Sequence, residues 1–379
     1  LFRGYAWNGA AAVNPADPRH LAVGIGFLGH DQCYVKHSVD GGKTWSLVQL
    51  PKLASRSADL YCRWSAPAVT FAADGSRLYA AYVPTGATSF LTGPILLSIS
   101  LDQGASWSAP TVTPLDQGDV DDVVISLAAA PEGRRLYLAA TATTAEHRVQ
   151  SLQFTSSGDQ GKAWTAPLTI ATDDPYDSIS LRGFSLAAGS KGSVLIAYGW
   201  SEYYPEPSFT VRIARSADQG ATFATGTAAQ NGVLQLSTPD IRIGPAGTAH
   251  LVYTRGPDYP PGDEAVLYRY SSPPYATWSA TAVRLDHGDS GVIRSSAHIA
   301  AGPCGKTSVL HATWLENPAS GGGGAVLYTR KLAQTGHVWS RPLPVGAAAA
   351  ALDRNSIAAA GPGAFAVWQT VPAAADNWT

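Results

Sequence analysis

The chain has 379 residues, of which 14% are charged and 45% hydrophobic, and its formal net charge is −2. This balance offers no basic stripe for a nucleic-acid partner, and no apolar run reaches the roughly 18–20 residues of a membrane-spanning helix. The charged fraction lies below the roughly 25% usual in globular domains. Together with 38 Gly and 26 Pro, it is typical of an all-β protein with many turns.

One eight-residue pattern organises the chain. It has the form S-x-D-x-G-x-x-aromatic and stands, in chain order, at residues 38–45, 100–107, 157–164 and 216–223, with degenerate copies at 271–278 and 332–339. Ser and Asp side chains accept hydrogen bonds from the backbone of a tight turn, and Gly adopts the positive φ that such a turn requires. We therefore expect self-capped hairpin turns whose Asp residues are structural and not catalytic.

The closing aromatic residues of these patterns lie about 60 residues apart, which indicates a repeat architecture. In each repeat two runs with the alternation of strands come first, a third strand enters the turn, and a fourth opens with the aromatic residue. The predicted inner pairs are residues 10–27, 66–83, 123–141, 184–200, 239–253, 297–314 and 356–371. Four-stranded units repeated radially form a β-propeller.

Seven inner pairs favour a propeller of seven four-stranded blades, with six blades and an overhang as the alternative. Because 379 residues are fewer than seven full repeats need, we expect the last blade to be incomplete or to be closed by the N-terminal segment Leu1–Ala6. No linker divides the chain, so a single domain spanning residues 1–379 is expected.

The three cysteines are too few for a disulfide framework. Cys33 and Cys62 flank the first turn pattern, and two interpretations of them stay open. They form a disulfide across adjacent strands, or they are two buried thiols.

The eight-residue pattern is the Asp box of the bacterial neuraminidase repeat, and the chain resembles sialidase-like propellers over nearly its whole length. The resemblance implies an exported protein, either secreted, periplasmic or at the cell surface. Asp boxes also occur in lyases and non-enzymatic propellers, so the motif implies the architecture and not the activity. Sialidases hold a substrate carboxylate with three arginines and use a Tyr–Glu nucleophile pair and an Asp acid. The R-I-P motif of their first arginine is absent from the first repeat here.

Four arginines nevertheless precede predicted inner strands by a few residues. Because such positions gather at one mouth of a propeller, we expect their guanidinium groups to converge on an anionic ligand, which they bind through two parallel hydrogen bonds. The alternative is that each pairs with a nearby acid such as Asp122, Asp177 or Asp289. The four arginines are Arg63, Arg182, Arg294 and Arg354.

The loop at residues 199–206 offers aromatic and acidic side chains on the same face as these arginines. We predict that Tyr203 or Tyr204 is the nucleophile and Glu202 its base, because a phenol must lose its proton to attack. Trp200 would stack on a sugar ring. The alternative is a solvent-facing loop with aromatic packing. The remaining candidates are Asp122 or Asp31 as the acid and Arg255 as a further substrate-binding group.

The working hypothesis is an exported sialidase-like glycoside hydrolase that acts on a glycan or another anionic small ligand at the mouth of the central channel. The alternatives are a non-catalytic propeller that binds glycan or protein in an extracellular assembly, and a polysaccharide lyase. No cofactor and no metal are expected, since Asp119, Asp121 and Asp122 lack the Gly-turned loop of a calcium site. His298 and His311, within predicted inner strands, are expected to be hydrogen-bonded core residues.

Overall fold

The computed structural model describes residues 6–27, 33–53, 62, 66–83, 94–115, 124–143, 150–173, 179–202, 208–231, 235–236, 239–256, 264–304, 307–332, 338–347 and 352–370. Apart from one 3-10 turn at Ser190–Gly192, the regular elements of these residues are strands, which confirms the predicted all-β class. Within the same residues, no helix has the length and apolarity that crossing a membrane requires.

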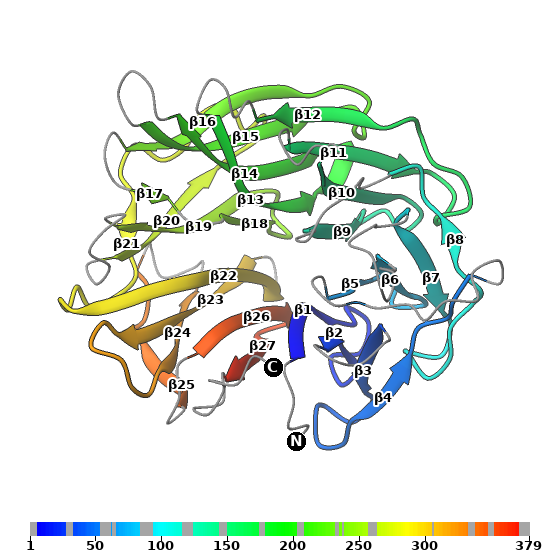
Figure 1. Ribbon diagram of the computed structural model, residues 1–379, viewed down its shortest axis with the longest axis horizontal. Coiled ribbons are helices and arrows are strands. Elements are labelled where there is room, and N and C mark those ends of the chain that lie inside the picture. The colour runs from blue at the N-terminus through cyan, green and yellow to red at the C-terminus, as the bar shows by residue number, and fades with distance from the viewer. Residues whose placement is uncertain are drawn as a thin grey trace, which may run out of the picture. The chain divides into compact units, whose positions relative to one another are not determined.

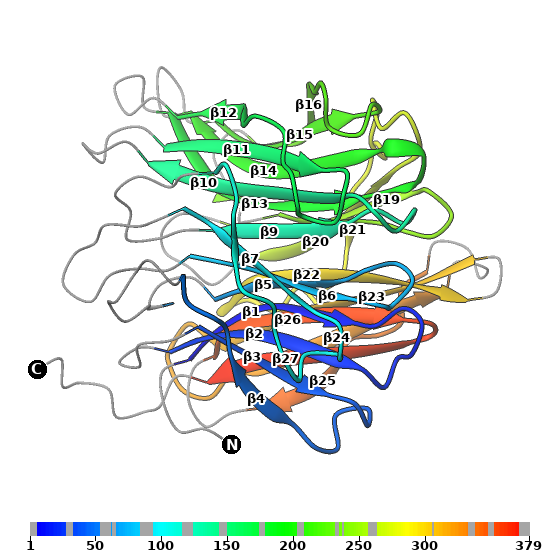
Figure 2. The same cartoon turned by 90° about the vertical axis from the view of Figure 1, so that its right-hand side faces the viewer.

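The first of two compact units contains Leu1–Leu181, Leu186–Leu195 and Ala214–Ala224. Its three complete sheets have the strand orders β1-β2-β3-β4, β5-β6-β7-β8 and β9-β10-β11-β12. The first strands of these sheets, β1, β5 and β9, lie next to one another in that order (Figure 1, Figure 2). The bounds are β1 (Ala6–Val13), β2 (Leu21–Phe27), β3 (Tyr34–Ser38), β4 (Ser46–Gln49), β5 (Ala68–Phe71), β6 (Leu78–Tyr82), β7 (Leu96–Ser100), β8 (Thr111–Val112), β9 (Ile125–Ala129), β10 (Leu136–Thr143), β11 (Gln150–Ser157) and β12 (Leu168–Thr172).

The second unit contains Arg182–Ser185, Ile196–Ile213 and Thr225–Thr379. It holds a five-stranded sheet of β17 to β21, the sheet β22-β23-β24-β25 and the pair β26-β27, while the sheet β13-β14-β15-β16 contributes residues to both units. The bounds are β13 (Ile179–Ala188), β14 (Val194–Glu202), β15 (Ser208–Ser216), β16 (Ala224–Asn231), β17 (Gln235–Leu236), β18 (Asp240–Ile243), β19 (Ala249–Gly256), β20 (Ala265–Ser271), β21 (Val283–Arg284), β22 (Val292–Cys304), β23 (Thr307–Pro318), β24 (Ala325–Leu332), β25 (Leu343–Ala347), β26 (Leu352–Ala360) and β27 (Gly363–Thr370).

The fold is a β-propeller with six blades of four or five antiparallel strands, counted over the described residues. The favoured count of seven is therefore wrong, and the alternative of six holds. The last inner pair is present as β26-β27, but among the described residues no further strand joins this pair. The alternation of apolar residues predicted a hairpin correctly, and a hairpin alone does not make a blade. Strand β1 pairs with β2 in the first blade, and residues 1–5 lie outside the described part.

The S-x-D-x-G turns hold themselves together by side-chain hydrogen bonds, as predicted. Ser38 Oγ donates to Asp40 Oδ1 at 2.8 Å and accepts the N–H of Gly42 at 2.9 Å, while Asp40 accepts the N–H and the hydroxyl of Thr44. The contacts of the Ser hydroxyl and the backbone N–H bond to the Asp recur in the next three turns. In the fourth turn, hydrogen bonds from Thr222 and Ser216 lower the pKa of Asp218 to about 2. These acids are engaged in their turns, so they serve structure.

Cys33 and Cys62 form a disulfide, which decides between the two interpretations of these residues. It closes a loop with a sequence separation of 29 residues. Both residues are buried in an apolar cluster with side chains of β2, β3 and β6. The disulfide therefore ties the first blade to the segment that leads into the second.

In the second unit we call β13, β18, β22 and β26 the first strands, and side chains on them link one sheet to the next. In each case an oxygen on one first strand accepts a backbone N–H from the following first strand, so the inner strands are joined edge to edge by polar contacts. The donor and acceptor pairs are Ile241 to Ser185, Ile299 to Asp240 and Asn355 to Ser296, at 2.9, 2.9 and 3.4 Å.

Candidate functional site

The predicted site residues of the second unit lie near the starts of first strands or the ends of second strands. These strand ends are opposite those that carry the S-x-D-x-G turns. In antiparallel sheets the start of the first strand stands beside the end of the second. Arg294, near the start of β22, is accordingly the register partner of Glu316 near the end of β23. Trp200 and Glu202 lie at the end of β14, and Arg255 lies near the end of β19.

Arg294 lies in a buried network of charges. Its side chain is 0% exposed, its Nε donates to Glu316 Oε1 at 3.0 Å, and its Nη1 donates to the backbone carbonyls of Glu264 and Asp289. Asp286 Oδ1 lies 3.5 Å from Nε. This geometry agrees with the pairing alternative, except that Asp289 contributes its carbonyl and not its carboxylate. The role of Arg294 in ligand binding stays a prediction.

Two arginines keep the Asp286 carboxylate of this network charged. Burial acts to raise the pKa of Asp286, but hydrogen bonds from Arg284 and from the N–H groups of Val266 and Gly288, together with the charge of Arg294, hold the pKa below its ordinary value. Arg284 Nη2 lies 2.8 Å from Asp286 Oδ1. Among the described residues, Arg294 Nη2 is buried and has no hydrogen-bond partner.

Glu202 lies in a second, more accessible cluster. The indole Nε1 of Trp200 donates to Glu202 Oε1 at 2.7 Å, and Arg212 Nη2 donates to the same oxygen at 2.9 Å. The guanidinium carbon of Arg212 lies 4.3 Å from the centroid of the Trp200 ring. The Glu202 side chain is 40% exposed, so the carboxylate is held in place and still open to a ligand.

Two features of this cluster were not predicted from the sequence: Arg212, and the pattern that Trp200 and Glu202 share with the sixth repeat. On β23, Trp314 Nε1 donates to Glu316 Oε1 at 3.0 Å, again across two residues of one strand. Side chains at i and i+2 of a strand point to the same face, so the spacing W-x-E was the available signal. The two copies differ in access, because the Glu316 side chain is only 17% exposed.

Several predicted site residues cannot be placed by their side chains. Arg182 lies in β13, and the structure describes only its backbone. Arg354 is half-buried in β26, and Arg255 is exposed in β19. The described residues therefore do not bring four guanidinium groups together, and their convergence stays a prediction. Outside the described residues lie Arg63, Asp31, Asp122, Tyr203 and Tyr204.

Two histidines of the second unit are buried beside tyrosine hydroxyls. His250 Nδ1 lies 2.8 Å from Tyr268 Oη, and His311 Nδ1 lies 2.8 Å from Tyr328 Oη. Burial lowers the pKa of His250 to about 3 and that of His311 to about 4. Both are neutral core residues at ordinary pH, as expected of His311.

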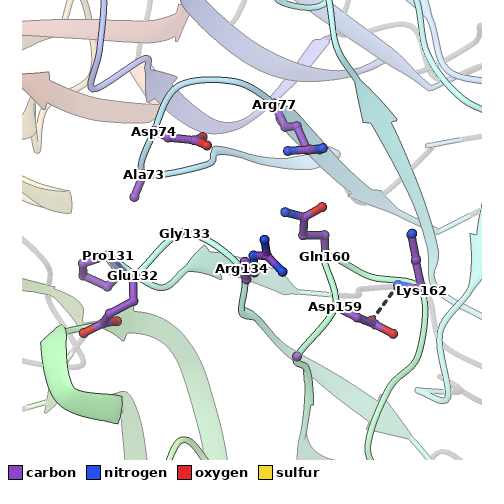
Figure 3. Close-up of a pocket in the computed structure, with 11 residues that line it drawn as sticks. Ala73, Asp74, Arg77, Pro131, Glu132, Gly133, Arg134, Asp159, Gln160 and Lys162 are labelled. Atoms are coloured by element: carbon purple, nitrogen blue, oxygen red, sulfur yellow. Dashed lines mark hydrogen bonds between the residues drawn. The ribbon is translucent and has the colours of Figure 1, made fainter.

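In the first unit, a pocket of about 740 Å³ opens beside the hairpin turns at residues 73–77, 131–134 and 158–162. We call it the turn-edge pocket. Figure 3 shows Arg77, Arg134 and Gln160 extending into it from three different turns. Its acids accept hydrogen bonds from neighbouring residues: Asp74 accepts the N–H and the hydroxyl of Ser76, and Asp159 accepts the N–H of Lys162 at 3.1 Å within its own turn. Glu132 accepts the N–H of Lys191 at 2.7 Å. This pocket offers cations but no pair of free carboxylates.

No group of three or more His, Cys, Asp or Glu in the described part of the chain is arranged to hold a metal ion. Asp119, Asp121 and Asp122 lie outside that part.

Comparison with known proteins identifies the fold. No family model and no curated protein matches the chain. Among solved structures, an α-L-arabinofuranosidase from Fusarium graminearum has a TM-score of 0.55 at 12% identity, covering 81% of this chain and 88% of that one. An α-L-arabinanase from Penicillium chrysogenum has a TM-score of 0.53 at 17% identity, covering 77% and 83%. The NanB sialidase from Streptococcus pneumoniae has a TM-score of 0.51 at 10% identity, covering 81% and 65%. The predicted resemblance to sialidase-like propellers is confirmed for the fold.

Proposed function

We propose that this sialidase-like propeller is a glycoside hydrolase whose site includes the Glu202 cluster. The observation that carries the proposal is the Glu202 carboxylate, which Trp200 and Arg212 hold through Oε1 while 40% of the side chain remains exposed. A fixed, accessible carboxylate is what a general base requires. The solved structures of similar fold include enzymes named as arabinofuranosidase, arabinanase and sialidase.

The proposed reaction proceeds in two steps. Glu202 takes the proton of the Tyr203 or Tyr204 hydroxyl, and the phenolate oxygen attacks the anomeric carbon. Asp122 or Asp31 protonates the departing glycosidic oxygen, so the bond to the leaving group breaks. Water, which gives a proton to the Asp carboxylate, then attacks the anomeric carbon and releases the sugar, and the tyrosine oxygen takes back its proton from Glu202. The arginines at the strand ends would hold an anionic group of the glycan.

We also propose that the protein works outside the cytoplasm. Disulfides persist in oxidising compartments and are rare in the cytosol, and Cys33 is bonded to Cys62. A glycan at a cell surface or in the periplasm is the substrate that such a location offers.

A panel of aryl glycosides tests the activity. We expect release of a fluorescent phenol from α-linked sialic acid or α-L-arabinofuranoside substrates. The Glu202→Gln variant should lower kcat by roughly 100-fold to 10,000-fold, the usual contribution of a general base. Glu132→Gln is the matched control, because Glu132 contacts Lys191 beside the turn-edge pocket, and it should leave kcat unchanged.

One observation favours the non-catalytic alternative. Arg294, one of the four candidate ligand-binding arginines, is fully buried and engaged by Glu316 and two backbone carbonyls. If no glycoside is turned over while a glycan array still shows binding, the non-catalytic propeller replaces the hydrolase. An unsaturated uronate product from acidic polysaccharides would instead identify a lyase.

A further inference from the structure

Three side chains on the first strands of the second unit form a group that the proposed glycoside hydrolysis does not use. Ser296 Oγ lies 3.3 Å from His298 Nε2, and His298 Nδ1 lies 3.3 Å from Asp240 Oδ2. Ser296 and His298 belong to β22, and Asp240 begins β18. A hydroxyl, an imidazole and a carboxylate are thus aligned, with one ring nitrogen facing each oxygen. His298 was expected to be a core residue, yet 29% of its side chain is exposed.

The carboxylate fixes the tautomer of the imidazole. Asp240 is 3% exposed and accepts hydrogen bonds from Arg242 Nη1 at 2.7 Å and from the N–H of Ile299 at 2.9 Å. Burial acts to raise the pKa of Asp240, but the charge of Arg242, the contact with His298 and the N–H of Ile299 hold the pKa below its ordinary value. An ionised carboxylate only accepts, so Nδ1 of His298 carries the proton. Nε2 is therefore the acceptor that faces the Ser296 hydroxyl.

Ser296 is held in an unusual backbone conformation. Its φ is 51°, in the left-handed region that non-glycine residues seldom adopt, and the pairing register of β22 shifts between Ser295 and His298. Ser296 stands within this irregularity, which has the form of a β-bulge, with its Oγ 3.3 Å from His298 Nε2. The side-chain amide of Asn355 donates to the Ser296 carbonyl at 2.7 Å, and the N–H of Asn355 lies 3.4 Å from Oγ. Strain of this kind is kept where the surrounding structure imposes it, and it clusters at functional sites.

We propose that Ser296, His298 and Asp240 form a second catalytic site, which hydrolyses esters of small acyl groups. Ser296 Oγ attacks the ester carbonyl carbon, and its proton passes to His298 Nε2 while Asp240 stabilises the imidazolium. The carbon–oxygen bond then breaks, and the alcohol leaves with that proton. Water, deprotonated by His298, attacks the acyl-serine, the acid is released, and the proton returns to Ser296. Ester and water thus become acid and alcohol. The N–H of Asn355 is the nearby donor for the oxyanion.

The competing explanation is structural. Asp240 also accepts the N–H of Ile299, one of the polar links between successive first strands. The same link is made by Ser185, which accepts the N–H of Ile241, without any histidine. Ser296 Oγ likewise accepts the N–H of Asn355, so both oxygens have a structural use. That use does not require the imidazole whose two nitrogens face them.

The test is a reagent that reacts only with activated serines. The full chain is treated with a fluorophosphonate, digested and analysed by peptide mass spectrometry, and hydrolysis of p-nitrophenyl acetate is measured in parallel. We expect one adduct, on Ser296, and an esterase rate that falls at least about 100-fold in Ser296→Ala. His298→Gln, whose amide can still donate to Asp240, should keep the fold and abolish the adduct.

Ser295→Ala is the matched control, since Ser295 stands at a regular register position opposite Leu315, and it should keep both the adduct and the esterase rate. Circular dichroism and thermal melting establish that each variant is folded. A folded wild-type chain without an adduct on Ser296, or an adduct that survives His298→Gln, would overturn the proposal. Either outcome leaves glycoside hydrolysis at the Glu202 cluster unaffected.

Discussion

Trp200 donates a hydrogen bond of 2.7 Å to Glu202, two residues further along the same strand. The indole also lies under the guanidinium of Arg212, which donates to the same carboxylate oxygen. One aromatic residue therefore positions both the acid and the cation of the candidate site. The corresponding pair on β23, Trp314 and Glu316, makes the same contact in a buried setting.

Replacing Trp200 with Phe should lower kcat/KM about 10-fold with little loss of stability. An aromatic ring is retained under Arg212, and the Glu202 carboxylate that loses the indole donor is 40% exposed and can accept from water instead, so the unfolding free energy should fall by no more than about 0.5–1.5 kcal/mol. Trp314→Phe is the comparison, because Trp314 is 0% exposed and Glu316 would keep its charge in a buried network. That variant should lose roughly 1–3 kcal/mol of unfolding free energy. Steady-state kinetics and urea denaturation of both variants check the contrast, and equal losses of activity would contradict it.

Arg294→Met should destabilise the chain strongly. It would leave the Glu316 and Asp286 carboxylates without the buried cation between them, and breaking a buried ion pair on one side costs about 3–5 kcal/mol. Arg255→Met is the control, because Arg255 is exposed on β19 and surface substitutions change stability by about 0.5 kcal/mol or less. Urea denaturation measures both. A loss below about 1 kcal/mol in Arg294→Met would show that the network does not hold the two sheets together.

Two glycines with the same backbone angle should respond differently to alanine. Gly220 has φ +85 and Gly133 has φ +86, so both variants carry the strain of a left-handed residue. A Cβ on Gly220 would stand 2.5 Å from the Phe154 ring, whereas a Cβ on Gly133 meets nothing within 4 Å. Gly133→Ala should cost about 1–2 kcal/mol, and Gly220→Ala should cost a further 1–3 kcal/mol from overpacking. Equal thermal stabilities of the two variants would contradict the prediction.

Stability should fall as the pH drops from 8 to 5. The unfolded chain protonates its histidines near pH 6.5, whereas burial keeps the pKa of His250 at about 3 and that of His311 at about 4. The unfolded state therefore binds more protons in this window, which costs about 2 kcal/mol for each histidine at pH 5. Acids with lowered pKa values, such as Asp218, add to the loss only below about pH 4. Urea denaturation at several pH values measures the slope, which should be halved in His311→Asn. A flat profile would mean that these histidines are not buried neutral groups.

The sequence predicted those features whose cause lies within a few residues. The partners of Asp40 and Asp159 stand inside their own eight-residue turns, so the turns and the repeat period could be read directly. The blade count failed because the pattern at 356–371 indicates a local hairpin and carries no information on whether two outer strands join it. The pairing of Cys33 with Cys62 stayed open because it depends on how strands separated in sequence lie in space.

The candidate site was harder to predict because its partners are set by register and by contacts between sheets. The sequence suggested nearby acids such as Asp289 as partners of the arginines, whereas the pairing of Glu316 with Arg294 follows from their positions across β22 and β23. His298 was expected to be a core residue because no partner for it stands nearby in the sequence. Its partner Asp240 precedes it by 58 residues. Ser296 stands in the register shift between Ser295 and His298 and contacts the ring from there, and no pattern in the sequence marks that shift.

Trapping the covalent intermediate shows whether this propeller cleaves glycosides through a tyrosine beside Glu202. The protein is incubated with activated fluoroglycosides of sialic acid and L-arabinofuranose, which slow the second step, and peptide masses are then mapped. We expect one glycosyl adduct on Tyr203 or Tyr204 that fails to accumulate in Glu202→Gln. An adduct on a residue away from the 199–206 loop, or turnover without any tyrosine adduct, would contradict it.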